Sequence, residues 1–188
     1  MEYFAEQDFD KNSFLKEKII KAEYEACTFK NCDFSRKHLS GFIFSDCRFI
    51  DCNLSLVSFK SAALKEVEFI DCKISGVDFS LVNPFLLEVK FIGSIVENCI
   101  FQDLNLKKTN FLNCSMKGAD FSNTKLQESK FLDCDLLDAT FDNSDLQKAD
   151  FRTSKNFRIN PSKNQLSGAK FSRHNIDGLL LDFKINIE

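Results

Sequence analysis

The sequence predicts an all-β protein, a β-helix whose four-sided coils each contain about 20 residues, and three observations lead to this fold class. Large apolar residues return at every fifth position, here called i, and 18 of the 22 phenylalanines lie at i. All eight cysteines lie at i−2, and all six glycines lie at i+2. A period of five matches neither a helix nor a strand, which indicates a repeat architecture.

Each position of the repeat has a structural meaning. Residues i and i−2 are two apart on an extended segment, so their side chains face the same way, and we expect both to point inward. Position i+2 collects glycine together with aspartate and asparagine, such as Asp133 and Asn143, which tolerate positive φ or bond their own backbone in a turn. Each repeat is therefore a short extended side followed by a corner, and stacked coils lie about 4.8 Å apart.

Stacking by 20 residues places like side chains above one another along the coil axis. One side of the coil carries the column Phe91, Phe111, Phe131 and Phe151. The opposite side carries Phe101, Phe121 and Phe141, with Leu106, Leu126, Leu146 and Leu166 on the side between. Large rings alternating with branched side chains would fill a narrow tube with few voids. About seven such coils form a rod roughly 35 Å long.

Three stretches carry a family motif. The segments ADFSN at 119–123, SDLQK at 144–148 and ADFRT at 149–153 have a small residue, then Asp, then Leu or Phe. This pattern resembles the pentapeptide-repeat family, and the resemblance covers roughly residues 4–151. It implies a right-handed quadrilateral β-helix, a handedness that the spacing alone does not show.

Residues 1–171 are predicted to form one such β-helix with two irregular stretches. The segment SLVNPFLLEVK at 80–90 inserts two residues into the count, which we interpret as a bulged corner between two continuous stacks. The segment 152–165 keeps the count but puts Asn156 and Pro161 at i, so we expect a distorted coil or loop there.

Residues 172–188 are predicted to form a separate C-terminal tail with a short helix and a strand. Helical i, i+3, i+4, i+7 spacing joins four apolar residues, and KINIE at 184–188 then alternates like a strand. The four apolar residues are Ile176, Leu179, Leu180 and Phe183. We expect the tail to cap the open end of the β-helix. The resemblance also implies a homodimer through this stripe, since some pentapeptide-repeat proteins end in a dimerising helix.

The sequence indicates no catalytic residues, metal ligands or cofactor, and we expect no enzyme. The pairs Cys27-x4-Cys32 and Cys47-x4-Cys52 resemble zinc spacing, but zinc ligands must converge, whereas these cysteines lie on adjacent sides of a filled coil. Packed, free thiols are therefore predicted. Only two histidines are present, and no glycine-rich phosphate loop occurs.

Composition limits the location and the partners of the chain. The acidic start MEYFAE has no apolar core, and no apolar run approaches the length of a membrane span, so we expect a cytoplasmic protein without a signal peptide or membrane partner. The formal net charge is −3 and no Lys/Arg run occurs, which argues against direct nucleic-acid binding.

The resemblance implies one specific function. Quinolone-resistance members of the family are acidic rods that resemble duplex DNA and bind type II topoisomerases, DNA gyrase or topoisomerase IV. Duplex DNA carries about 20 charges over 35 Å, far more than the net charge of −3 here. Between Phe131 and Phe151, however, the sequence contains six aspartates and only one basic residue, Lys148. This candidate partner-binding acidic coil consists of Asp133, Asp135, Asp138, Asp142, Asp145 and Asp150.

The acidic coil also has a structural interpretation, and both remain open at the level of sequence. Asp135, Asp145 and Asp150 lie at i−1, where the family motif itself places Asp or Asn. On this interpretation the chain is a generic rigid scaffold that binds an unknown protein partner and has no gyrase activity.

Overall fold

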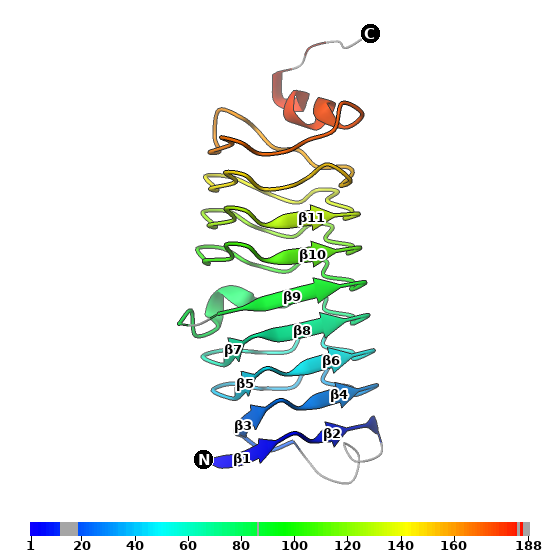
Figure 1. Cartoon of the computed structure of the whole chain (residues 1–188), viewed down its shortest axis with the longest axis vertical. Coiled ribbons are helices and arrows are strands. Elements are labelled where there is room, and N and C mark those ends of the chain that lie inside the picture. Colours follow the sequence, from blue (N-terminus) through cyan, green and yellow to red (C-terminus); the bar gives the residue numbers. More distant parts are fainter. Residues whose placement is uncertain (12–18, 86, 184, 186–188) are drawn as a thin grey trace.

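The structure is a computed structural model that describes residues 1–11, 19–85, 87–183 and 185, and it is one continuous stack of coils (Figure 1). The first coil and the C-terminal helical turns lie at opposite ends of the stack (Figure 1). Every strand pairing is parallel, and the strands form two sheets along the rod. The predicted all-β fold class, with coils of about 20 residues, is confirmed.

The two sheets follow two of the four sides of the coil. The first sheet has the order β1-β3-β5-β7 and consists of β1 (Glu2–Ala5), β3 (Ala22–Glu25), β5 (Ile43–Ser45) and β7 (Ala63–Lys65). The second has the order β11-β10-β9-β8-β6-β4-β2. It consists of β2 (Asp8–Phe9), β4 (Thr28–Lys30), β6 (Arg48–Ile50), β8 (Val67–Ile70), β9 (Val89–Ile92), β10 (Asn110–Leu112) and β11 (Lys130–Leu132).

We number the four sides from the larger sheet, following the chain. Side 1 is the β2–β11 sheet. Side 2 contains the bridges from Ser115 to Asp135 to Lys155, and side 3 contains the bridge from Asp120 to Thr140. Side 4 contains the β1–β7 sheet, and its register continues through bridges such as Lys125 to Asp145. Away from the inserted segment, paired residues are 20 apart, so each coil places its residues directly above those of the coil before.

The corners adopt the left-handed backbone conformation that the i+2 pattern predicts. Asp133 has φ 56°, Asp138 has φ 58° and Gly118 has φ 64°. Residues that favour this conformation poorly also occupy corners, including Leu56 with φ 58°. Backbone hydrogen bonds to the next coil hold the corners in place, as when the amide of Asn113 donates to the carbonyl of Leu132 at 2.8 Å.

Two opposed ladders of phenylalanine fill the tube. On side 1 the ring of Phe131 stacks on Phe111 at 4.7 Å and on Phe151 at 4.8 Å between centroids. On side 3 the ring of Phe121 stacks on Phe101 and Phe141 at 4.9 and 5.0 Å. The two ladders meet edge to face across the centre, as aromatic pairs prefer. The predicted inward direction of position i is correct for these rings.

The cysteines at i−2 fill the remaining core beside the rings, and all eight are buried with free thiols. Each is placed to donate to a backbone carbonyl, as Cys134 does to Phe111 of the coil before at 3.3 Å. Serine and threonine take the same position in other coils, where Ser144 donates to the carbonyl of Phe121 at 2.7 Å. Burial raises the pKa of Cys47 and Cys99 to about 12, so these thiols stay protonated and unreactive at neutral pH.

The inserted segment interrupts the regular stack. Across it the strand register changes from 20 to 22 residues, since Val67 pairs with Val89. The extra length forms the 3-10 turn η1 (Phe79–Leu81), capped by the Asp78 carboxylate, and a loop that projects from the rod (Figure 1). Phe85 on this loop is 76% exposed.

The last coil and the tail depart from the repeat. In the coil at 152–165 the core is filled by Phe157 and Ile159, because Asn156 and Pro161, the residues at i, are exposed. The predicted C-terminal helix is present as two 3-10 turns, η2 (Ile176–Leu179) and η3 (Leu181–Phe183). The predicted strand at 184–188 lies outside the described residues except for Ile185, which is not in a strand.

Candidate interaction surfaces

The described residues bring together no group that could hold a metal ion. No helix in the same part of the chain is long and apolar enough to cross a membrane. His38 and His174 are both exposed, on side 3 of the rod and in the tail respectively. The surface features that remain are the acidic coil, the tail and a groove along one edge.

The six aspartates of the acidic coil are spread around the whole circumference. Asp133 is at the corner after side 1, and Asp138 is at the corner after side 2. Asp135 lies on side 2, Asp145 on side 4, and Asp150 on side 1 of the next coil. They therefore form a ring around the rod and do not share one face.

Basic residues outside the interval Phe131–Phe151 pair with three of these aspartates. Lys117 lies 3.6 Å from Asp135, and Lys163 lies 3.4 Å from the exposed carboxylate of Asp142. Counting charge only within the interval misses these partners, because Lys117 and Lys163 come from neighbouring coils and the third, Arg152, lies just beyond Phe151. The local charge of −5 that the sequence suggests is therefore an overestimate.

Asp150 is the member of the ring that differs most from its expected role. It is buried, at 6% exposure, and is held by a two-pronged hydrogen bond from Arg152, with a closest distance of 2.7 Å. This hydrogen bond holds the pKa of the Asp150 carboxyl below its usual value. Asp150 therefore does not present a free carboxylate to a partner.

Asp138 and Asp142 are the two aspartates that best fit a binding role. Both are exposed, and they lie on the corner before side 3 and on side 3 itself. Asp138 has no ion pair to another described residue, whereas Asp142 shares a loose one with Lys163.

The tail covers the end of the tube with one part of its apolar stripe and exposes the rest. Leu179 packs against the core and Leu180 is partly buried. Ile176 and Phe183 are about half exposed, at 49% and 48%. Leu181, which the helical spacing did not single out, is also exposed, at 55%.

A groove that sequence reasoning missed follows the corner between sides 4 and 1. This edge groove encloses about 720 Å³ and crosses several coils beside the inserted segment. It is lined by Ala26, Asp46, Arg48, Glu66, Val67, Glu68, Leu87, Glu88, Val89, Lys90, Asn105, Lys107, Lys108, Thr109 and Asn110. The two-residue insertion is the sequence signal that marks its position.

The fold and its surfaces define a parallel β-solenoid with quadrilateral coils and a capped C-terminal end. The family model for the pentapeptide repeat region matches residues 22–111, 82–151 and 110–181, so the chain belongs to the pentapeptide-repeat family. No curated protein sequence matches the chain significantly.

Two solved structures resemble the chain over most of its length. Full-length QnrB1, a plasmid-mediated fluoroquinolone resistance protein, is 20% identical with a TM-score of 0.54, and the match covers 97% of each chain. HetL, a pentapeptide-repeat protein involved in heterocyst differentiation regulation in the cyanobacterium Nostoc sp. strain PCC 7120, is 13% identical with a TM-score of 0.58. That match covers 90% of this chain and 84% of HetL. At these identities the likeness shows the fold.

Proposed function

We propose that the chain is a non-enzymatic, cytoplasmic protein-interaction solenoid and that its partner is a type II topoisomerase. The observation that carries this proposal is the match to QnrB1 along almost the full length of both chains, including the C-terminal end of the rod. A rigid rod whose core is filled by ring ladders presents its outer side chains at fixed spacing, which lowers the entropy cost of binding.

A second candidate is a scaffold for a different protein partner. The distribution of the aspartates favours it, because they encircle the rod and three of them are paired with basic residues. HetL matches this fold with a TM-score comparable to that of QnrB1 and has a different described role. The fold alone therefore does not select between the two partners.

A gyrase assay separates the candidates. If the partner is a type II topoisomerase, purified protein should change DNA supercoiling by gyrase, or its inhibition by ciprofloxacin, in a dose-dependent way. Changing Asp138 and Asp142 together to lysine should abolish the effect without unfolding the rod, because both side chains are exposed. The effect should also weaken as salt rises, since contacts between exposed charges are screened.

The matched control changes Asp51 and Asp71 to lysine at the corner after side 1. These are also exposed aspartates, so the change in net charge is the same. If both variants lose the effect on gyrase equally, the effect depends on net charge and not on the positions of Asp138 and Asp142. If wild-type protein has no effect on gyrase or topoisomerase IV at low salt, the topoisomerase proposal is wrong and the scaffold function is supported.

We also propose that the exposed part of the tail forms a homodimer. Changing Ile176 and Phe183 together to aspartate should convert the protein to a monomer, because a charge placed in an apolar contact must be desolvated. Sedimentation velocity at micromolar concentration measures the change. Leu137→Asp is the control, because Leu137 is a similarly exposed apolar residue on the side of the rod, at 45%. A wild-type protein that sediments as a monomer contradicts the dimer.

A further inference from the structure

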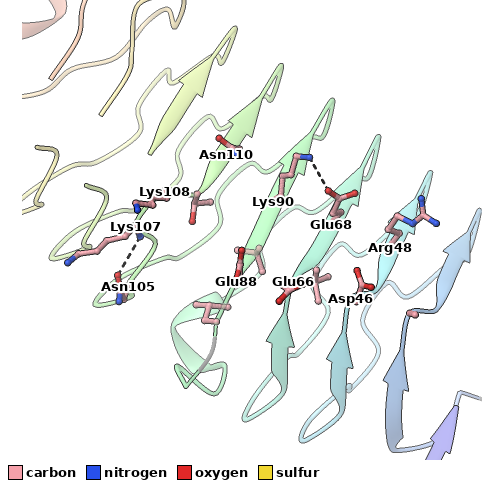
Figure 2. A pocket seen from close by; sticks show the side chains of 15 residues that line it. Asp46, Arg48, Glu66, Glu68, Glu88, Lys90, Asn105, Lys107, Lys108 and Asn110 are labelled. Atoms are coloured by element: carbon pink, nitrogen blue, oxygen red, sulfur yellow. Dashed lines mark hydrogen bonds and ion pairs between the residues drawn. The ribbon is translucent and has the colours of Figure 1, made fainter. Parts of the chain in front are cut away.

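The edge groove exists because the inserted segment displaces side 4. The side-4 sheet ends at β7, and Leu87 and Glu88 continue the wall in its place. Glu88 keeps the coil-to-coil hydrogen bonds, since its carbonyl accepts from Val67 and its amide donates to Leu64, both at 2.9 Å. In the next coil the turn at Asn105 and Lys107 forms the far wall (Figure 2).

A row of charges runs along the groove in register. The pairings of β6, β8, β9 and β10 place Asp46, Glu66, Glu88 and Lys108 at equivalent positions of four successive coils. Figure 2 shows the three carboxylates in a line, with Lys107 and Lys108 beyond the end at Glu88. Successive coils lie about 4.8 Å apart, so the row spans about 14 Å.

The parallel row on side 1 consists of Arg48, Glu68, Lys90 and Asn110, so Arg48 places a positive charge at the Asp46 end of the groove. There Glu68 and Lys90 form an ion pair at 2.9 Å and neutralise each other (Figure 2). Asp46, Glu66 and Glu88 have no ion pair to any residue that the structure describes. The acidic part of the groove is therefore centred on Glu66 and Glu88, Asp46 lies beside Arg48 at one end, and Lys107 and Lys108 form the basic end.

This arrangement fits an extended peptide. Alternate side chains of an extended chain are about 6.6 Å apart, so three of them span about 13 Å, close to the length of the row. Two basic side chains would lie along the three carboxylates, and an acidic side chain two residues further on would meet Lys107 and Lys108. The mostly polar, charged lining suits such a segment better than an apolar small molecule.

We propose that the edge groove binds an extended segment of a partner protein with the pattern basic-x-basic-x-acidic, running along the rod axis with its acidic residue toward Lys108. The inference rests on the proposed protein-interaction function and names the surface and the partner chemistry. It does not require that the partner be a topoisomerase.

The probe is a fluorescein-labelled peptide with the core Lys-Val-Lys-Val-Asp, and the readout is fluorescence anisotropy at low and high salt. Wild-type protein should bind this peptide and bind the charge-reversed peptide, Asp-Val-Asp-Val-Lys, at least tenfold more weakly. Changing Glu66 and Glu88 together to lysine should weaken binding of the first peptide about tenfold, because two attractions become repulsions. Lysine is accommodated at this corner, as Lys108 with φ 61° shows.

The matched control again changes Asp51 and Asp71 to lysine, which alters net charge equally on a different corner. Adding Lys108→Glu to the groove variant should reverse the preference, so that the charge-reversed peptide binds more tightly. Wild-type protein that fails to bind the first peptide, or a control variant that loses binding as much as the groove variant, would overturn the proposal. Because the assay contains no topoisomerase, its failure is distinct from failure of the gyrase assay.

Discussion

Replacing Phe121 with alanine is expected to lower the free energy of unfolding by about 3–5 kcal/mol. The ring of Phe121 is fully buried and contacts four other rings, stacking on Phe101 and Phe141 and meeting Phe111 and Phe131 edge to face. Removing it leaves a cavity in the middle of the ladder, which the neighbours cannot close because hydrogen bonds between coils fix their spacing. Urea denaturation followed by circular dichroism measures the loss.

The matched control is Lys125→Ala, four residues along the chain on side 4. Lys125 is exposed, and its amide donates to the carbonyl of Leu104 while its carbonyl accepts from the amide of Leu106, so its side chain can be removed without opening the core. We expect a change below about 0.5 kcal/mol for this variant. Comparable losses for the two variants would show that the inward assignment of position i is incorrect.

The core could be predicted from sequence because each of its positions repeats with the same phase in coil after coil. A parallel stack places residue n beside residue n + 20, so one period determines both which residues are buried and which rings stack. The rule failed where the backbone leaves that period. Phe157 fills the core one residue after the expected position, because the coil at 152–165 has a different backbone path.

The surface was less predictable, since it depends on which outward side chains from different coils meet. Lys117 pairs with Asp135 across a coil boundary, and the exposed Arg152 binds the buried carboxylate of Asp150. A charge count limited to the interval Phe131–Phe151 contains neither contact. The edge groove likewise arises from an insertion whose effect on the wall depends on three-dimensional packing, although its location was visible in the broken period.

Gly178→Val is expected to detach the tail from the end of the tube. A Cβ at position 178 would lie 2.5 Å from both a ring carbon and the carbonyl oxygen of Phe157, far inside van der Waals contact. The carbonyl of Gly178 also accepts a hydrogen bond from the amide of Ile159 at 3.0 Å, so the two backbones cannot move apart without breaking it. A larger side chain at position 178 can therefore be accommodated only if this hydrogen bond breaks and the tail moves away from Phe157.

We expect Gly178→Val to lower stability by about 1–3 kcal/mol, the usual range for an overpacked core, and to make the tail susceptible to proteolysis. Detachment would expose Phe157 and the ring of Phe171 beside it, so a dye that binds apolar surface should bind the variant more strongly. Asp177→Val is the control, because it introduces the same side chain at the adjacent exposed position. If Gly178→Val unfolds at the wild-type urea concentration and its tail resists protease, the tail does not close the tube. If Gly178→Val instead loses stability and its tail becomes cleavable, while Asp177→Val shows neither change, the Gly178–Phe157 contact is what closes the tube. The closing contact is then distinct from the exposed residues that we assign to the dimer.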